Sequence, residues 1–306
     1  MSPAAGKSVI RIGTRRSRLA MAQAESVAGA IRALGAGAEA ELVPIVTSGD
    51  RMAGRLRDVG GKGLFTVELE RALRAGDVDI AVHSAKDVPV AMADDLAIVA
   101  VPARLDPRDG LVSRDGWSLA GLPASARVGT GSPRRAAQLR EARADLEIVP
   151  IRGNVDTRLR KALGADRRLD AVVLAMAGLI RSGLAETHAN NICPLAAADF
   201  VPAAGQGALA VQALADNEDI ARLLSPINDA DSLRAVMAER SVLKALGADC
   251  RSCIGVYVRP EVGRWRGSLV LGRAEGVGPA RMQAEGNTPE RVAEGLIEAA
   301  RGRDEA

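Results

Sequence analysis

Aromatic side chains are scarce in this chain and make up 2% of its 306 residues. Proteins that bind single-stranded nucleic acid usually stack its bases on aromatic rings, so this scarcity argues against that function. The net charge of +3 is also too small for a general polyanion-binding surface. We therefore expect no nucleic-acid partner.

Histidine and cysteine are few as well, with two and three residues respectively. Two histidines without a patterned set of carboxylates do not suggest a metal site. Three cysteines do not form a disulfide framework, which indicates a reducing compartment. The first seven residues lack the apolar segment of a secretory signal, and no run approaches the roughly 18 apolar residues of a membrane span. We expect a cytoplasmic protein that binds neither metal nor membrane.

Short apolar segments alternate with helical segments through the first two thirds of the chain, which is typical of an α/β fold with mainly parallel sheets. The pattern breaks at 102–109, where Asp106, Pro107, Arg108 and Asp109 predict a turn, and then restarts. Two similar units in tandem imply two lobes with a cleft between them. We expect strands at 9–12, 41–46, 79–82, 96–101, from 127, 147–151, 171–175 and 208–212, and helices at 19–34, 65–75, 134–144 and 155–163.

The character of the sequence changes from Asn217. A helix at 232–246, strands near 255–258 and 268–272, and a closing helix at 288–300 predict a small α+β domain. The strand at 208–212 is expected to cross back to the first lobe. The predicted domains are therefore 1–102 with 204–216 as the first lobe, 103–203 as the second lobe, and 217–306 as the C-terminal domain.

A charged cluster follows the predicted strand at 79–82. His83, Ser84, Lys86 and Asp87 come directly after it, and Pro89 ends the regular structure. In open α/β sheets, ligands bind outside the carboxyl ends of the strands, so these side chains are candidates for chemistry on a bound molecule. The alternative is an ordinary surface turn with a Lys–Asp pair.

Arginines gather at other predicted strand ends and helix starts, where helix N-termini add N–H donors. Together they predict a cleft for a ligand with several carboxylates or phosphates. Hydroxyl donors at Ser17, Thr130, Ser132 and Thr157 support this, although N-capping explains some of them. The arginines are Arg15, Arg134, Arg135, Arg152, Arg158 and Arg181.

Two further segments leave alternatives open. The glycine-rich segment 60–63 with Lys62 lacks the spacing of a phosphate-binding loop, so it is either a lid over the cleft or an exposed connection. Cys250 and Cys253 form a single C-x-x-C pair. Zinc sites usually need a second pair, and redox pairs usually open a helix, so a plain buried thiol is the simplest interpretation.

Taken together, five segments resemble the porphobilinogen deaminase family, also called hydroxymethylbilane synthase. They are TRRS at 14–17, VGGKGLF at 59–65, HSAKDVP at 83–89, RGNVDTR at 152–158 and AAGQGA at 203–208. The resemblance covers almost the whole chain. It implies two periplasmic-binding-protein-like lobes plus a small α+β domain, whose cysteine holds a dipyrromethane cofactor by a thioether.

The resemblance also implies an activity. Members of the family join four porphobilinogen molecules head to tail, release ammonia each time, and free the linear tetrapyrrole hydroxymethylbilane for haem biosynthesis. The dipyrromethane serves as a primer that stays attached. The family resemblance favours a monomer whose partner is the small-molecule substrate porphobilinogen.

Residue by residue, the resemblance implies a catalytic role for Asp87, which stabilises the cation formed when the substrate loses its amine. It implies lid residues Lys62 and Phe65. Cofactor binding is implied for Cys250, Lys86, Ser84, Thr130, Ser132, Arg134 and Arg135, and substrate binding for Arg15, Ser17, Arg152, Arg158 and Arg181.

The cofactor loop departs from the family pattern. Where the family usually reads Gly, Gly or Ser, Cys, any residue, Val or Thr, and Pro, this chain reads ADCRSC at 248–253. The flanking motifs 239–240 and 254–255 make Cys250 the matching thiol and put Cys253 where proline is usual. A catalytically degenerate homologue and a two-lobed protein that only binds an anionic ligand are therefore alternatives, although a mere binder needs neither Asp87 nor Cys250.

Overall fold

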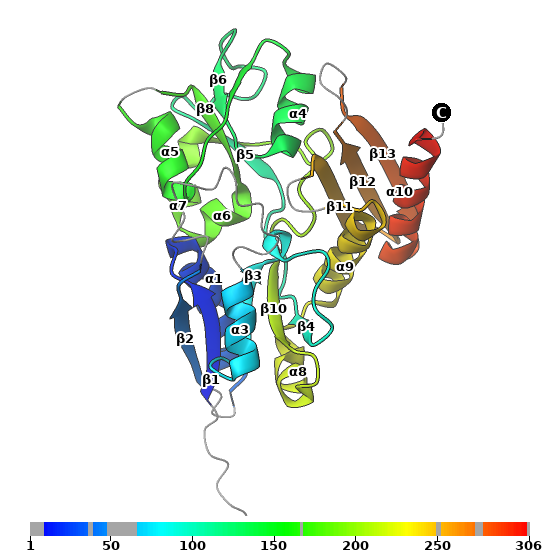
Figure 1. The fold of residues 1–306 in the computed structure, drawn as a ribbon. Helices are drawn as coiled ribbons and strands as arrows, with labels where there is room; N and C mark the ends of the chain where they lie inside the picture. Colours follow the sequence, from blue (N-terminus) through cyan, green and yellow to red (C-terminus); the bar gives the residue numbers. More distant parts are fainter. Residues whose placement is uncertain are drawn as a thin grey trace, which may run out of the picture. The chain divides into compact units, whose positions relative to one another are not determined.

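The computed structural model describes residues 9–35, 39–47, 66–165, 168–248, 252–272 and 278–304. Internal contacts divide the chain into two compact units: unit 1 is Met1–Arg104 with Ala208–Leu233, and unit 2 is Leu105–Gly207 with Arg234–Ala306. The described strands form three sheets, two of them rich in parallel pairs and one antiparallel (Figure 1). The predicted α/β fold class is confirmed. No helix within the described ranges is long and apolar enough to cross a membrane.

Unit 1 is built on a five-stranded sheet in the order β2-β1-β3-β10-β4. The first three strands pair in parallel, whereas β10 runs antiparallel to both β3 and β4. The expected return of the strand near 208–212 to the first sheet is thus observed. The bounds are β1 Val9–Arg15, β2 Glu39–Ile45, β3 Ile80–Ser84, β4 Leu96–Ala100, β10 Leu209–Leu214, α1 Arg18–Ala33, α3 Val67–Ala75, α8 Glu218–Leu224, and the 3-10 turns η1 Ala85–Asp87 and η3 Ser225–Ile227.

Helices cover both faces of this sheet because successive residues of β3 point to opposite sides. Ile80 and Val82 share a core cluster with Ile31 of α1, while Ala81 packs with Leu69 of α3 in a second cluster. A strand buried on both faces needs a continuous apolar sequence, and that run made β3 recognisable from the sequence.

Unit 2 contains a second five-stranded sheet, in the order β7-β6-β8-β5-β9. Strand β6 is parallel to β7 and β8, and β5 is antiparallel to β8 and β9. Leu139 of α4 packs on one face with Val173, and Leu159 of α5 packs on the other with Val172. The bounds are β5 Asp109–Ser113, β6 Arg127–Gly129, β7 Glu147–Val149, β8 Ala171–Ala175, β9 Ile192–Pro194, α4 Pro133–Ala142, α5 Val155–Leu163, α6 Met176–Arg181, α7 Leu184–Thr187 and η2 Ala189–Asn191.

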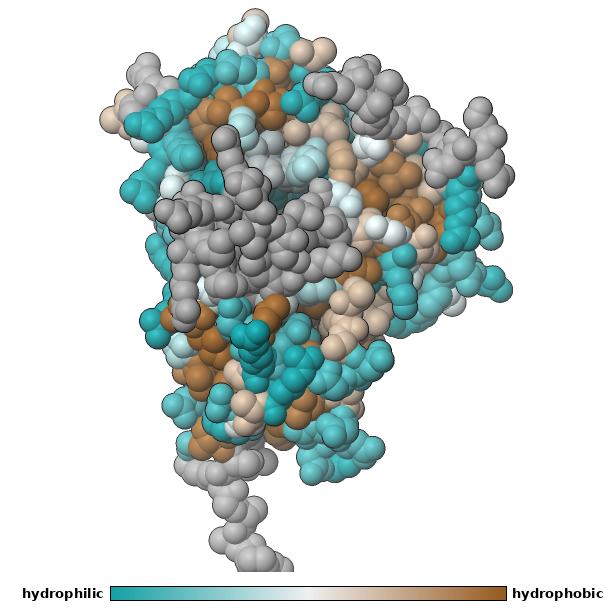
Figure 2. Space-filling view, viewed as in Figure 1, coloured by the Kyte–Doolittle hydropathy of each residue, from teal (hydrophilic) through white to brown (hydrophobic). Residues whose placement is uncertain are grey.

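The last part of unit 2 is an antiparallel sheet, β11-β12-β13, covered by α10 and by α9 from Arg234 onward. Leu269 and Val292 lie in its core. Figure 2 shows hydrophilic residues along the outer side of α10, whose exposed positions include Glu294 and Glu298. The bounds are β11 Ile254–Glu261, β12 Arg264–Leu271, β13 Ala280–Gly286, α9 Ala230–Ala245 and α10 Pro289–Asp304. The predicted division into three domains stays a prediction.

The expectation of a turn running through Asp109 is wrong. Asp109 begins the buried strand β5, and before it the N–H of Arg108 donates to Asp106 Oδ1 at 2.9 Å. An ionised carboxylate is tolerated there because two guanidinium groups neutralise it. Strand β13 was also not expected, although its alternation of exposed and covered residues is a recognisable strand pattern.

Candidate functional site

In unit 1, the carboxyl ends of β1 and β3 lie side by side. The two strands are parallel, with Ile12 opposite Ile80 and Gly13 opposite Ala81. Parallel neighbours end at the same edge of the sheet, so Arg15, the last residue of β1, is brought to the end of β3. The sequence predicted that Arg15 and the cluster after β3 lie close together, and the register of β1 and β3 brings their carboxyl ends to the same edge of the sheet.

The cluster after β3 forms a single 3-10 turn. Ser84 ends the strand and is half-buried, Lys86 is half-buried, and Asp87 is exposed. The N–H of Ala85 donates to the carbonyl of Ala208 at 3.0 Å, which anchors the turn beside the start of β10. The turn therefore presents an ammonium and a carboxylate on a fixed backbone at the sheet edge.

His83 lies behind this turn and takes no part in it. Its ring is buried, and Nε2 lies 3.0 Å from Oε1 of Gln212. Burial lowers the pKa of His83 to about 4, the positive charge of Arg15 lowers it further, and the bond to Gln212 opposes the shift. A neutral, buried imidazole at neutral pH fits a structural role rather than proton transfer to a ligand.

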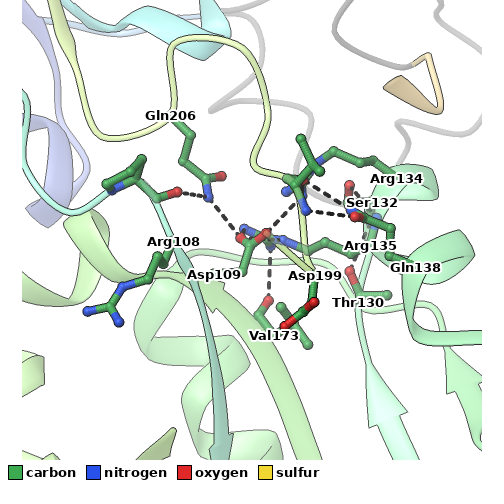
Figure 3. Close-up of polar contacts among 12 residues, drawn as sticks. Arg108, Asp109, Thr130, Ser132, Arg134, Arg135, Gln138, Val173, Asp199 and Gln206 are labelled. Carbon is green, nitrogen blue, oxygen red and sulfur yellow. Dashed lines mark hydrogen bonds and ion pairs between the residues drawn. The ribbon is translucent and has the colours of Figure 1, made fainter. Parts of the chain in front are cut away.

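In unit 2, a buried carboxylate holds two adjacent arginines of α4 (Figure 3). Oδ1 of Asp109 accepts from Arg135 Nε at 2.9 Å and Nη2 at 2.7 Å, and Arg134 Nη1 lies 2.8 Å from Oδ2. Nε2 of Gln206 donates to the same Oδ1 at 2.9 Å. Arg135 also donates to the carbonyl of Val173 at 2.9 Å. The cluster contains two cations and one anion, and hence an excess of one positive charge.

Charge and burial compete in this cluster. Burial would raise the pKa of Asp109, but Arg134 and Arg135 outweigh it and hold the pKa well below its usual value. Burial in turn lowers the pKa of Arg134, against the attraction of Asp109. The arginine side chains are 4% and 7% exposed and Asp109 is fully buried, so these are interior charges held by one another.

The hydroxyl residues at the helix starts act mainly as caps. Ser132 Oγ accepts from the N–H of Arg135 at 3.4 Å, and Ser17 Oγ accepts from the N–H of Ala20 at 3.2 Å. Thr130 Oγ1 accepts from the N–H of Ser132 at 3.2 Å. N-capping therefore accounts for Ser17 and Ser132, each of which satisfies one N–H group of a first helical turn.

The remaining predicted arginines occupy different settings in unit 2. Arg152 is exposed just beyond β7, and Nε of Arg158 donates to the carbonyl of Gly153 at 2.7 Å. Arg181 ends α6 and donates to the carbonyl of Gly207 at 2.8 Å. Burial lowers the pKa of Arg181 to about 10, which leaves it charged at neutral pH. Within the described ranges, no carboxylate pairs with Arg181, so its charge suits an anionic ligand.

Three predicted site residues, Lys62, Phe65 and Cys250, lie outside the described residues. Cys253 is described and half-buried. Burial raises the pKa of its thiol, and the nearby charge of Arg134 opposes that shift only in part. The thiol of Cys253 therefore stays protonated at neutral pH, which makes it a poor nucleophile.

The sequence interpretation missed Asp109 as a member of the arginine cluster. An acidic residue directly before the apolar segment 110–112 was the available signal, since a buried carboxylate needs a cationic partner. Gln206 was noted only as part of a motif, and the structure adds its hydrogen bonds to Asp109 and to the carbonyl of Pro107.

Comparison with known proteins gives the family. Residues 10–222 match the family model described as porphobilinogen deaminase, dipyromethane cofactor binding domain. The chain belongs to the porphobilinogen deaminase family. It is 49% identical over 260 residues to the porphobilinogen deaminase of Acidothermus cellulolyticus, covering 83% of this chain and 76% of that protein. The porphobilinogen deaminase of Sorangium cellulosum is 46% identical over 290 residues, covering 92% and 94%.

The predicted family is therefore confirmed, over nearly the full length of both chains in the Sorangium comparison. Among solved structures, an ABC transporter protein from Parabacteroides distasonis aligns with a TM-score of 0.42 and 14% identity, covering 76% of this chain and 74% of that one. The roles assigned to single residues by the family resemblance stay predictions.

Proposed function

We propose that this chain is a hydroxymethylbilane synthase. It joins four porphobilinogen molecules head to tail, with release of ammonia, on a covalently attached dipyrromethane primer. The observation that carries the proposal is the family match over residues 10–222, supported by relatives that are 44–49% identical. The activity belongs to tetrapyrrole and haem biosynthesis.

The residues of unit 2 fit a dipyrromethane. Each pyrrole carries carboxylate side chains, which bind well to guanidinium forks and to N–H groups at a helix start. The start of α4 offers the guanidinium groups, because Arg134 and Arg135 carry an excess of positive charge over Asp109. Thr130 and Ser132 add hydroxyl groups to the same helix start. When bound, the dipyrromethane supplies the pyrrole end to which the first substrate is joined.

The chemistry at the reacting centre falls to Asp87. Loss of ammonia from porphobilinogen leaves a cation conjugated with the pyrrole ring. An exposed carboxylate on a fixed turn stabilises such a cation and accepts or returns its proton. Lys86 on the same turn and Ser84 at the end of β3 would hold carboxylates of the cofactor.

Substrate carboxylates would be held by the arginines that follow the strands. The position of Arg15 at the end of β1 and of Ser17 at the start of α1 supports this role. The positions of Arg152 and Arg158 around the start of α5, and of Arg181 at the end of α6, support the same role. A chain that grows by one ring at a time accumulates carboxylates, which explains the use of several arginines.

Cys250 is the proposed attachment point for the thioether. Its register in the family motif supports this, and the raised pKa of the Cys253 thiol argues against that neighbour. The loop departs from the family pattern, so a degenerate protein that loads its cofactor poorly is the second candidate.

The intact mass of the purified protein tests the proposal. After expression in cells that make porphobilinogen, the chain should carry the mass of a dipyrromethane, and peptide mapping should place it on Cys250. The Cys250→Ser variant should lack the adduct. A wild-type chain without added mass that forms no hydroxymethylbilane from porphobilinogen would contradict the proposal.

A further inference from the structure

The backbone of Val201 lies at a buried junction in unit 2, where it meets α4. Its N–H donates to Gln138 Oε1 at 2.7 Å, and its carbonyl accepts from Gln138 Nε2 at 3.1 Å. The same carbonyl accepts from Arg134 Nη1 at 2.6 Å. Gln138 is 1% exposed, so its amide makes these bonds away from water. One side chain thus satisfies both polar groups of one buried residue.

The orientation of the Gln138 amide is determined by a second donor. Arg281 of β13 places Nη2 3.5 Å from Gln138 Oε1, and the same Nη2 donates to Glu141 at 2.6 Å and to the carbonyl of Asp199 at 2.7 Å. A reversed amide would set its NH2 group against both the guanidinium and the N–H of Val201. Only the observed orientation pairs every donor with an acceptor.

The start of β11 rests on the same carbonyl. A Cβ atom added at Gly255 would lie 2.8 Å from the oxygen of Val201, closer than real Cβ atoms come, and 3.1 Å from Cδ of Arg134, which is a tight contact. Glycine is therefore needed for this approach of strand to carbonyl. Cys253 precedes Gly255 by two residues, and the positive charge of Arg134 acts to lower the pKa of its thiol. A shift of the Val201 carbonyl would move both Arg134 and the start of β11.

We propose that Gln138 is a positioning residue that holds the Val201 backbone and, through it, aims Arg134 and anchors the strand that follows the cofactor cysteine. The inference rests on the proposed function, in which Arg134 holds a cofactor carboxylate and Cys250 carries the cofactor. Without Gln138, the N–H of Val201 is buried without a partner, and the Val201 carbonyl loses the donor Nε2 while it keeps the bond from Arg134. Nη1 of Arg134 is then bonded to a carbonyl that is held less firmly, while its second partner, Asp109 at 2.8 Å, stays in place.

Two variants separate the contributions of the amide. Gln138→Leu removes both bonds to Val201, whereas Gln138→Glu keeps an acceptor for the N–H and, when ionised, lacks the donor. Glu141→Gln is the matched control, because it weakens the ion pair with Arg281 and leaves Gln138 in place. The first measurement is the rate at which iodoacetamide alkylates Cys253, followed by peptide mass mapping.

We expect Cys253 to react about tenfold faster in Gln138→Leu, the effect of weakening the local structure by about 1.4 kcal/mol, with a smaller rise in Gln138→Glu. Glu141→Gln should stay within about twofold of the wild type, since a half-exposed ion pair contributes little. The second measurement is the fraction of chains that carry the dipyrromethane mass. It should fall in both Gln138 variants and stay at the wild-type level in Glu141→Gln.

Wild-type alkylation and wild-type loading in either Gln138 variant would overturn the inference. If Gln138→Leu does not fold, Gln138→Glu decides by the same two measurements. A wild-type chain that carries no adduct counts against the proposed function alone, because alkylation of Cys253 still reports whether Gln138 anchors the strand.

Discussion

Arg135 holds the carboxylate of Asp109 through two donors, with Nε at 2.9 Å and Nη2 at 2.7 Å from Oδ1. Both side chains are buried, so neither partner has water as an alternative. The pair ties the first residue of β5 to the start of α4, and this connection places the proposed cofactor arginines. Removing either partner would leave an uncompensated charge in the interior.

We expect Asp109→Asn to destabilise unit 2 by about 3–5 kcal/mol, because it leaves two buried guanidinium groups without a counter-ion. The control Asp219→Asn breaks an exposed ion pair with Arg222 and should cost less than about 0.5 kcal/mol. Urea unfolding followed by circular dichroism measures both. Equal midpoints for the two variants would contradict the expectation.

The same carboxylate predicts a pH dependence at the acid end. The pKa of Asp109 is lowered in the folded state, so the folded chain binds fewer protons there than the unfolded chain. Its stabilisation is present above the unfolded pKa of about 3.9 and is lost as the pH falls through the folded value. Asp109→Asn should therefore unfold with a flatter pH dependence below about pH 4 than the wild type, in urea titrations at stepped pH.

His83 predicts a second pH dependence, at milder pH. Its pKa is lowered to about 4 from an ordinary value of 6.5, mainly by burial. Between these values the unfolded chain binds a proton that the folded chain does not, so stability falls as the pH drops, by up to about 3 kcal/mol. In His83→Gln this part of the pH dependence should disappear, while His188→Gln should keep it. Urea midpoints at pH 7.5 and pH 5 are compared for each chain. If the midpoint of His83→Gln falls between these pH values as much as that of the wild type, the prediction is refuted.

Asp87→Ala should fold normally and lose turnover by about 100-fold to 10,000-fold, as expected for the loss of a general acid–base and electrostatic group. Its exposed side chain gives no reason for a stability change. Asp94→Ala, on an exposed turn of the same unit, is the control and should keep wild-type turnover. Hydroxymethylbilane formation from porphobilinogen gives the rate, and near-wild-type turnover in Asp87→Ala would remove this residue from the mechanism.

Cys253→Ser should keep the dipyrromethane adduct. The raised pKa of the Cys253 thiol keeps it protonated at neutral pH, so it does not compete for the cofactor. Intact mass with peptide mapping compares this variant with Cys250→Ser. Loss of the adduct in Cys253→Ser, with retention in Cys250→Ser, would show that the family register was assigned to the wrong cysteine.

Much of the fold could be predicted from local sequence patterns. The helix Val155–Leu163 and the strand Ala171–Ala175 have the predicted bounds, because an N-cap at Asn154 and a continuous apolar run mark them locally. The short helices Met176–Arg181 and Leu184–Thr187 were missed, since six and four residues are too few to show helical periodicity.

The candidate site divides in the same way. The position of Lys86 and Asp87 after a buried strand could be predicted, because the end of an apolar run is visible in the sequence; Ser84, expected after the strand, is its last residue. The buried partner of Arg135 could not be predicted from the sequence. Asp109 lies 26 residues earlier in the chain and Gln206 lies 97 residues after Asp109, so no local pattern connects them.

The sequence by itself determined the family, the α/β order of the elements and the arginines at the strand ends, because motifs and periodicity are properties of neighbouring residues. Tertiary structure alone decided which charges are held inside the protein. It buried His83 against Gln212 as a neutral ring, paired Arg134 and Arg135 with Asp109, and placed Gln138 on Val201. Burial and long-range pairing determine the cost of a charge, and both arise only when distant segments pack together.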